Sequence, residues 1–344
     1  MSEKTSDGKD LFPNNIQFLC NLPTDSFASM GLDNSICVFK SINDIYYLIY
    51  SNLNNSIISF NLINNKIINE IKNAHNSDIT NFRYCLDSKN KRDLILSISF
   101  GDNNLKLWDA NNWMCLLNLQ TVNNIGYIKT SCFLNDTKNI YIITSNSCES
   151  DLIEPIKIYD LNGNKIKEIN ESNEDTIFID TYFDKKLSIY FIITGNNGYI
   201  KSYNYNENSS YLIYKDIENY YDHSSIIIDN NNNEEIVNMI ESCGDGFVRI
   251  WNFHSAQIIK KIKVSNSFLY SIYLWDNNYL LVTSRDKKIK IISLSDGEIK
   301  KELGGYDKDV ITVKSINHPI YGKCFISKGK FNEQIKLWII QNKN

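Results

Sequence analysis

Apolar and polar residues alternate in one short segment that recurs along the chain. Its clearest copy is Leu105-Lys106-Leu107-Trp108-Asp109, in which a lysine separates two leucines. A period of two residues is typical of a strand with one buried face, and a helix would not show it. Aligned on its fourth residue, which we call the anchor, the segment occurs seven times, with the anchors Phe60, Trp108, Tyr159, Tyr203, Trp251, Ile292 and Trp338.

Neighbouring segments complete a four-stranded unit around each anchor. An apolar strand over 93–99 precedes the Trp108 strand and is joined to it by a short turn at 101–104 that consists of Gly, Asp and Asn. A further strand follows the anchor, as at 256–264, and another precedes the pair, as at 267–275. Consecutive anchors lie 41 to 51 residues apart, which is at or slightly above the period of propeller blades. We therefore predict an all-β fold, a seven-bladed β-propeller of four-stranded antiparallel blades.

The two ends of the chain are expected to meet in the last blade. The sequence ends six residues after Trp338, which leaves the seventh unit without its outer strand. The segment Ile16–Cys20 is apolar and surplus to the repeats, and Pro13 and Pro23 flank it. Because an open sheet edge invites aggregation, we expect this segment to pair beside the Trp338 strand. The predicted organisation is a flexible tail over 1–14 and a single propeller over 15–344.

The repeated pattern resembles the WD-repeat family, whose blades end their third strand in Trp-Asp and begin with a Gly-His pair. In that family a hydrogen-bonded relay of Asp, His, Ser or Thr, and Trp can fasten a blade. The resemblance implies such a relay in the second blade, formed by His75, Ser97 or Ser99, Asp102 and Trp108.

Other blades keep only parts of this relay. The matching residues in blades five and six are Asp245 with Trp251, and Asp286 with Ser284. In the seventh blade Tyr306 follows Gly304-Gly305, where the family pattern has His, and other anchors replace Trp by Tyr or Ile. These departures predict that the blades differ in stability.

Composition and charge narrow the classes of function. Hydrophobic residues make up 42% and charged residues 22% of the chain, as in globular proteins with a large core. The formal net charge of -4 argues against a nucleic-acid partner, whose phosphates require a basic face. No apolar run approaches the ~18 to 20 residues of a membrane span, so we expect no membrane association. The first ten residues are polar and do not resemble a secretory signal. We expect a cytoplasmic protein, with the nucleus as the alternative.

The sequence does not predict catalytic chemistry. The four histidines fall in different predicted blades, and no cysteine pair has zinc-knuckle spacing. The sequence has no Gly-x-Ser-x-Gly elbow and no Gly-rich phosphate loop that ends in Gly-Lys-Ser/Thr. We therefore expect no metal, no cofactor and no enzymatic activity. The eight cysteines are expected to be reduced, mostly buried thiols.

Protein binding is the leading hypothesis for function. Tyrosine is abundant, and Tyr is enriched in binding hot spots. Connections between blades and turns between second and third strands are a usual binding surface in the WD-repeat family, and the candidate contact residues there are Arg83, Tyr127, Tyr221, Arg285 and Tyr306. Packing of these tyrosines between blades is the alternative. We expect a chain that is monomeric on its own and acts as a scaffold in a complex with other proteins. A propeller enzyme or small-ligand binder that uses the central channel remains the competing hypothesis.

Overall fold

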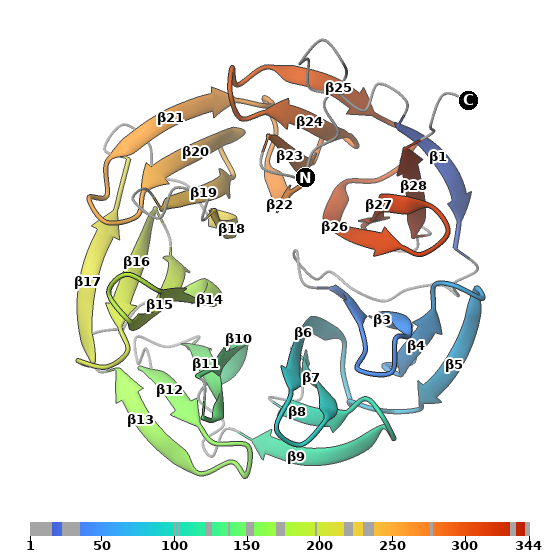
Figure 1. Ribbon diagram of the computed structural model, residues 1–344, viewed down its shortest axis with the longest axis vertical. Helices are drawn as coiled ribbons and strands as arrows, with labels where there is room; N and C mark the ends of the chain where they lie inside the picture. Colours follow the sequence, from blue (N-terminus) through green and yellow to red (C-terminus); the bar gives the residue numbers. More distant parts are fainter. Residues whose placement is uncertain are drawn as a thin grey trace.

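The computed structural model describes residues 16–22, 35–99, 101, 104–120, 126–136, 138–148, 155–169, 176–196, 198–216, 223–229, 237–275, 278–330 and 335–340. Within these ranges the chain forms 28 strands and no helix. The strands make seven four-stranded antiparallel sheets, which are arranged as blades in a ring (Figure 1). The predicted seven-bladed β-propeller is confirmed.

The first four blades follow one another along the chain. Blade 1 contains β2 (Ile36–Lys40), β3 (Tyr46–Ser51), β4 (Ile57–Asn61) and β5 (Lys66–Ile71). Blade 2 contains β6 (Ile79–Asp87), β7 (Arg92–Ser99), β8 (Asn104–Asp109) and β9 (Met114–Gln120). Blade 3 contains β10 (Gly126–Asn135), β11 (Ile140–Cys148), β12 (Ile156–Tyr159) and β13 (Lys165–Ile169). Blade 4 contains β14 (Thr176–Asp184), β15 (Ile189–Asn196), β16 (Tyr199–Asn204) and β17 (Ser209–Tyr214).

The remaining blades complete the ring. Blade 5 contains β18 (His223–Asp229), β19 (Asn238–Cys243), β20 (Phe247–Asn252) and β21 (Ile258–Lys263). Blade 6 contains β22 (Leu269–Leu274), β23 (Tyr279–Ser284), β24 (Ile289–Ser293) and β25 (Ile299–Leu303). Blade 7 contains β26 (Val310–His318), β27 (Gly322–Gly329), β28 (Lys336–Ile340) and, from the other end of the chain, β1 (Ile16–Asn21).

The N-terminal strand closes the ring as predicted. β1 pairs antiparallel with β28, and Phe18 lies opposite Trp338. Ile16 is buried, and its carbonyl accepts a hydrogen bond of 2.9 Å from Nζ of Lys301 in blade 6. Figure 1 shows the dark-blue β1 on the outer side of the red β28. Both ends of the chain therefore contribute to one sheet, and the outer edge of β28 is covered.

The hydrophobic core lies between neighbouring blades. One cluster joins Tyr50, Phe60 and Leu62 of blade 1 to Ile326 and other buried side chains of blade 7. Each blade therefore buries both faces of its sheet against its neighbours, as the short strands with apolar side chains on both faces require.

The antiparallel order gives the ring two distinct faces. Turns from first to second and from third to fourth strands lie on one face, which we call face A. Turns from second to third strands and connections between blades lie on the opposite face, which we call face B. Asparagines shape several of these turns: Asn55, Asn65 and Asn208 have φ of 55°, 54° and 59°, a left-handed conformation that Asn tolerates.

Candidate interaction surfaces

The predicted relay of blade 2 is present and passes through Ser97. His75 Nε2 lies 2.7 Å from Ser97 Oγ, and Trp108 Nε1 donates to the same hydroxyl oxygen at 2.8 Å. All three side chains are buried. Ser99 Oγ is buried too, but it has no hydrogen-bond partner among the described residues. Asp102 lies outside the described residues, so its predicted place in the relay stays a prediction.

Replacing Ser97 by alanine is expected to destabilise the protein by about 1–3 kcal/mol, because the Trp108 N–H would lose its acceptor in a buried site. Ser99→Ala is the matched control, since it removes a hydroxyl that bonds to none of the described residues. Urea unfolding of the two variants and the wild type measures the difference. An equal loss of stability in both variants would contradict the assignment of Ser97.

Blade 7 contains a second relay, in which Tyr306 stands in the place of histidine. The Tyr306 hydroxyl hydrogen-bonds with Ser327 Oγ, and Trp338 Nε1 donates to that serine at 2.6 Å. Tyr306 is only 6% exposed. The prediction that it contacts a partner is therefore replaced by a structural role. A sequence signal existed: in both relays the serine lies 11 residues before the Trp anchor, and His75 and Tyr306 lie four residues before the first strand.

Blade 5 is fastened by ion pairs instead. Asp245 does not bond to Trp251, whose indole N–H has no partner among the described residues. Arg249 is 2% exposed, and its Nη2 lies 2.6 Å from Asp245 Oδ2. Arg249 Nε lies 2.8 Å from Asp216 Oδ2. The predicted pairing of Asp245 with Trp251 is thus corrected to a pairing with this buried guanidinium, a stronger partner for a carboxylate than an indole N–H.

In blade 6 the predicted contact between Asp286 and Ser284 is confirmed. The Ser284 hydroxyl donates to Asp286 Oδ1, and Ser265 and Lys290 donate to Oδ2. Burial alone would raise the pKa of Asp286, but these hydrogen bonds, that of Lys290 foremost, hold it below its usual range. The carboxylate is therefore ionised and ties the β23–β24 turn to the connection that precedes β22.

Lysines two residues before the anchors add a recurring contact. Each ammonium group donates to the backbone carbonyl of the residue just before His75 or its counterpart in that blade, which is Ser265 in blade 6 and Tyr306 in blade 7. The pairs are Lys106 with Ala74, Lys290 with Val264, and Lys336 with Gly305. Each of these lysines lies between two apolar residues in the sequence and holds the third strand to the connection that begins the blade.

The remaining candidate contact residues differ in their surroundings. Arg83 lies on β6, where its Nε donates to the Ser131 carbonyl at 3.0 Å and its Nη2 to the Ile179 carbonyl at 3.2 Å. It therefore joins blades 2, 3 and 4. Arg285 is exposed in the β23–β24 turn on face B, as predicted. Tyr127 is paired with Ser147 through the backbone, but its side chain lies outside the described residues, and so does the whole of Tyr221.

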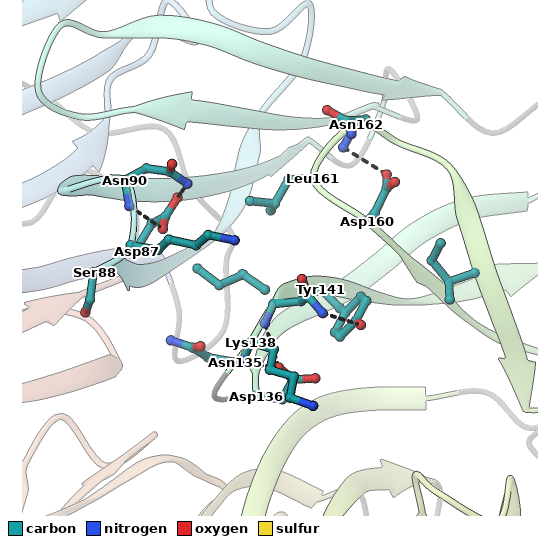
Figure 2. A pocket seen from close by; sticks show the side chains of 14 residues that line it. Asp87, Ser88, Asn90, Asn135, Asp136, Lys138, Tyr141, Asp160, Leu161 and Asn162 are labelled. Carbon is teal, nitrogen blue, oxygen red and sulfur yellow. Dashed lines mark hydrogen bonds between the residues drawn. The ribbon is translucent and has the colours of Figure 1, made fainter.

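A polar cavity of about 750 Å³ lies on face A between blades 2 and 3. Figure 2 shows its walls, which are the β6–β7, β10–β11 and β12–β13 turns. Asp87 binds Arg92 at 2.8 Å, and Asp160 accepts hydrogen bonds from the backbone amides of Asn162 and Asn164. Burial alone would raise the pKa of both carboxyls, but hydrogen bonds from Asn90 and Arg92 to Asp87, and from Asn164 and Asn162 to Asp160, hold both pKa values below their usual range. Asp87 and Asp160 are thus ionised and shape their own turns.

Apolar side chains are exposed elsewhere on face A, where blades 7 and 1 meet. Ile320 is 64% exposed in the β26–β27 turn, beside Tyr321, and Ile63 is exposed in the β4–β5 turn. We call Ile63, Ile320 and Tyr321 the turn patch. None of these three residues is among the predicted contact residues, which are Tyr and Arg side chains expected on face B.

Buried His318 fixes the shape of the turn patch. Its Nε2 lies 3.0 Å from the carbonyl oxygen of Leu62 in blade 1, and its Nδ1 accepts the amide of Ile320 at 3.1 Å. Since Nδ1 is an acceptor and Nε2 faces an oxygen, the imidazole carries its proton on Nε2. The His318 ring also stacks on Tyr321, with centroids 4.7 Å apart. One side chain thus holds the turns of two blades together.

The six cysteines whose side chains are described are free thiols, and all of them except Cys115 are buried. Burial raises the pKa of Cys37 to about 12 and that of Cys85 to about 11. These thiols therefore stay protonated at neutral pH and behave as apolar core groups.

Lys328 is a buried amine on β27, with an exposed fraction of 0%. Burial lowers its pKa from 10.5 to about 7. The unfolded chain therefore binds more protons than the native state between pH 7 and 10.5, so this residue makes stability rise with pH across that window. Its destabilising effect is complete below pH 7.

Lys328→Met is expected to raise the free energy of unfolding by about 1–3 kcal/mol at pH 7, because an apolar side chain of similar length carries no desolvation cost. The gain should shrink as the pH approaches 10. Chemical denaturation at several pH values measures it, with Lys186→Met on the surface as the control. A gain that does not depend on pH would contradict the prediction.

Metal-binding clusters and membrane-spanning helices are absent from the described ranges. None of the His, Cys, Asp and Glu side chains there gather in a group of three or more that could hold a metal ion. The same part of the chain contains no helix that could cross a membrane. No protein-family model matches the chain, and no curated protein matches it in sequence.

Proposed function

We propose that this chain is a WD-repeat-type propeller that acts in the cytoplasm as a non-catalytic scaffold for other proteins. Two observations support the family. Blades 2 and 7 each join a Trp anchor to a serine of the second strand and to a His or Tyr before the first strand. The anchors also recur with the spacing of propeller blades.

The turn patch is the observation that carries the scaffold role. Exposed apolar side chains on a rigid surface mark interaction sites, because water leaves them when a partner binds. Ile320 and Tyr321 lie in a turn that His318 fastens to blade 1. A partner that contacts them would meet a pre-formed surface and would lose little conformational entropy on binding.

Affinity purification of the tagged protein from its native cells tests this proposal. We expect a stoichiometric partner protein with the wild type, and its loss with Ile320→Asp combined with Tyr321→Ala. Arg285→Ala on face B is the matched control and should retain the partner. Loss of the partner with Arg285→Ala alone would show that the partner contacts face B. A wild-type protein without any partner would contradict the scaffold role.

A further inference from the structure

The innermost strands of six blades share one register. Each contains a β-bulge near its start, which begins at Ile79, Ile128, Thr176, His223, Leu269 or Val310 in blades 2 to 7. Four residues further along each strand, the equivalent positions hold Arg83, Cys132, Asp180, Ile227, Tyr273 and Lys314. Asp180 is the one carboxylate among these six described positions. It therefore introduces a negative charge at this level of the ring.

Asp180 lines a cavity of about 370 Å³ between β14 and β18. Most of the other wall residues are apolar or aromatic: Tyr182, Phe183, Ile193, Ile226, Ile227 and Ile228, with Thr181 beside them. Sites for small molecules typically combine such apolar walls with a few polar groups that orient the ligand. The volume accommodates a short alkyl chain with a polar head group.

The Asp180 carboxylate has capacity for a ligand. It is half-buried, and among the described residues it accepts one hydrogen bond, from the Thr181 amide at 2.8 Å. The nearby guanidinium of Arg83 is directed to the carbonyl oxygens of Ser131 and Ile179 and lies over the Phe178 ring. Arg83 is thus held by backbone acceptors and an aromatic ring, so that the carboxylate can accept further donors.

We propose that this cavity binds a primary alkylammonium group. The ammonium donates to Asp180, and the alkyl chain packs against the isoleucines of β18. The carboxylate disfavours anionic ligands, and the apolar walls disfavour a bare hydrated cation. The ammonium comes either from a free amine or from a lysine side chain of another protein. The inference does not depend on the scaffold role, because the cavity lies between innermost strands and shares no residue with the turn patch.

Calorimetric titration with n-butylammonium chloride tests the proposal, with n-butanol as the uncharged control ligand. We expect the amine to bind and the alcohol to bind at least about tenfold more weakly, because a hydrogen bond to a charged group is much stronger than a neutral one. Asp180→Asn should weaken amine binding by a similar factor, whereas Asp180→Glu should retain part of it. Glu207→Gln, an exposed carboxylate in the β16–β17 turn, is the matched control and should bind as the wild type does.

A second ligand and a third variant of the site complete the test. Binding of Nα-acetyl-lysine N-methylamide as well would show that lysine side chains of proteins fit, whereas binding of n-butylammonium alone would restrict the site to free amines. Ile228→Trp fills the cavity and should abolish binding even if Asp180→Asn fails to fold. The proposal is overturned if the wild type binds neither amine, if n-butanol binds equally well, or if the folded Asp180→Asn variant keeps the wild-type affinity.

Discussion

Deletion of residues 1–22 is expected to abolish the monomeric propeller. These residues include β1, whose backbone pairs with β28 and covers the outer edge of that strand. Without it, β28 presents unpaired N–H and C=O groups, and Trp338, which is 4% exposed in the intact protein, faces water. An unpaired apolar edge pairs readily with other chains. We therefore expect oligomers or precipitate in size-exclusion chromatography.

Two control experiments distinguish the loss of the pairing between β1 and β28 from the effect of shortening the chain. Deleting residues 1–14 leaves β1 intact and should leave a monomer. A synthetic peptide that spans residues 14–22, added during refolding of the shortened chain, should restore monomers by supplying the strand in trans. A shortened chain that elutes as a stable monomer without the peptide would show that blade 7 closes without β1.

The architecture could be predicted because it depends on patterns that are local in the sequence. The alternation around each anchor predicts a strand, and the regular spacing of anchors predicts identical units. The structure adds one detail in six blades, a β-bulge directly before the anchor, as between Leu107 and Trp108. The surplus apolar segment at Ile16 could have only one place in such a ring, the edge beside Trp338.

The surroundings of individual side chains were harder to predict, because they depend on register. Arg83 was assigned to a binding surface, but the bulge between Ile79 and Asn81 sets which side of β6 it occupies. Its guanidinium therefore meets the carbonyls of blades 3 and 4. Tyr306 was assigned to the same surface, although its position relative to Val310 matches that of His75 relative to Ile79. A comparison of blades by register would have placed it in a relay.

The exposed apolar residues could not be identified from the sequence for a different reason. Isoleucine is common throughout the chain, and most isoleucines are buried. Ile320 follows a strand with an ordinary apolar pattern, and its exposure is decided by how the β26–β27 turn meets blade 1. That contact depends on His318 and Leu62, which are 256 residues apart. Only the closed ring brings them together.

Arg249→Ala is expected to destabilise the protein by about 3–5 kcal/mol, the cost of removing one partner from a buried ion pair. The guanidinium lies between Asp216 and Asp245, and Glu241 Oε1 is 3.9 Å from its Nε. Asp245 and Glu241 are almost completely buried. Without the arginine, these carboxylates would have to remain ionised in a site of low polarity or take up protons, and both alternatives cost free energy.

Chemical denaturation of matched variants distinguishes this mechanism from a general loss of packing. Arg249→Lys keeps the charge but contacts one carboxylate at a time, so it should fall between Arg249→Ala and the wild type. Arg285→Ala, an exposed arginine in the next blade, should change stability by less than about 0.5 kcal/mol. Combining Arg249→Met with Asp245→Asn should recover part of the loss, because the second change removes the carboxylate that the first leaves unpaired. A double variant as unstable as the sum of its single variants would show that Arg249 acts through packing and not through Asp245.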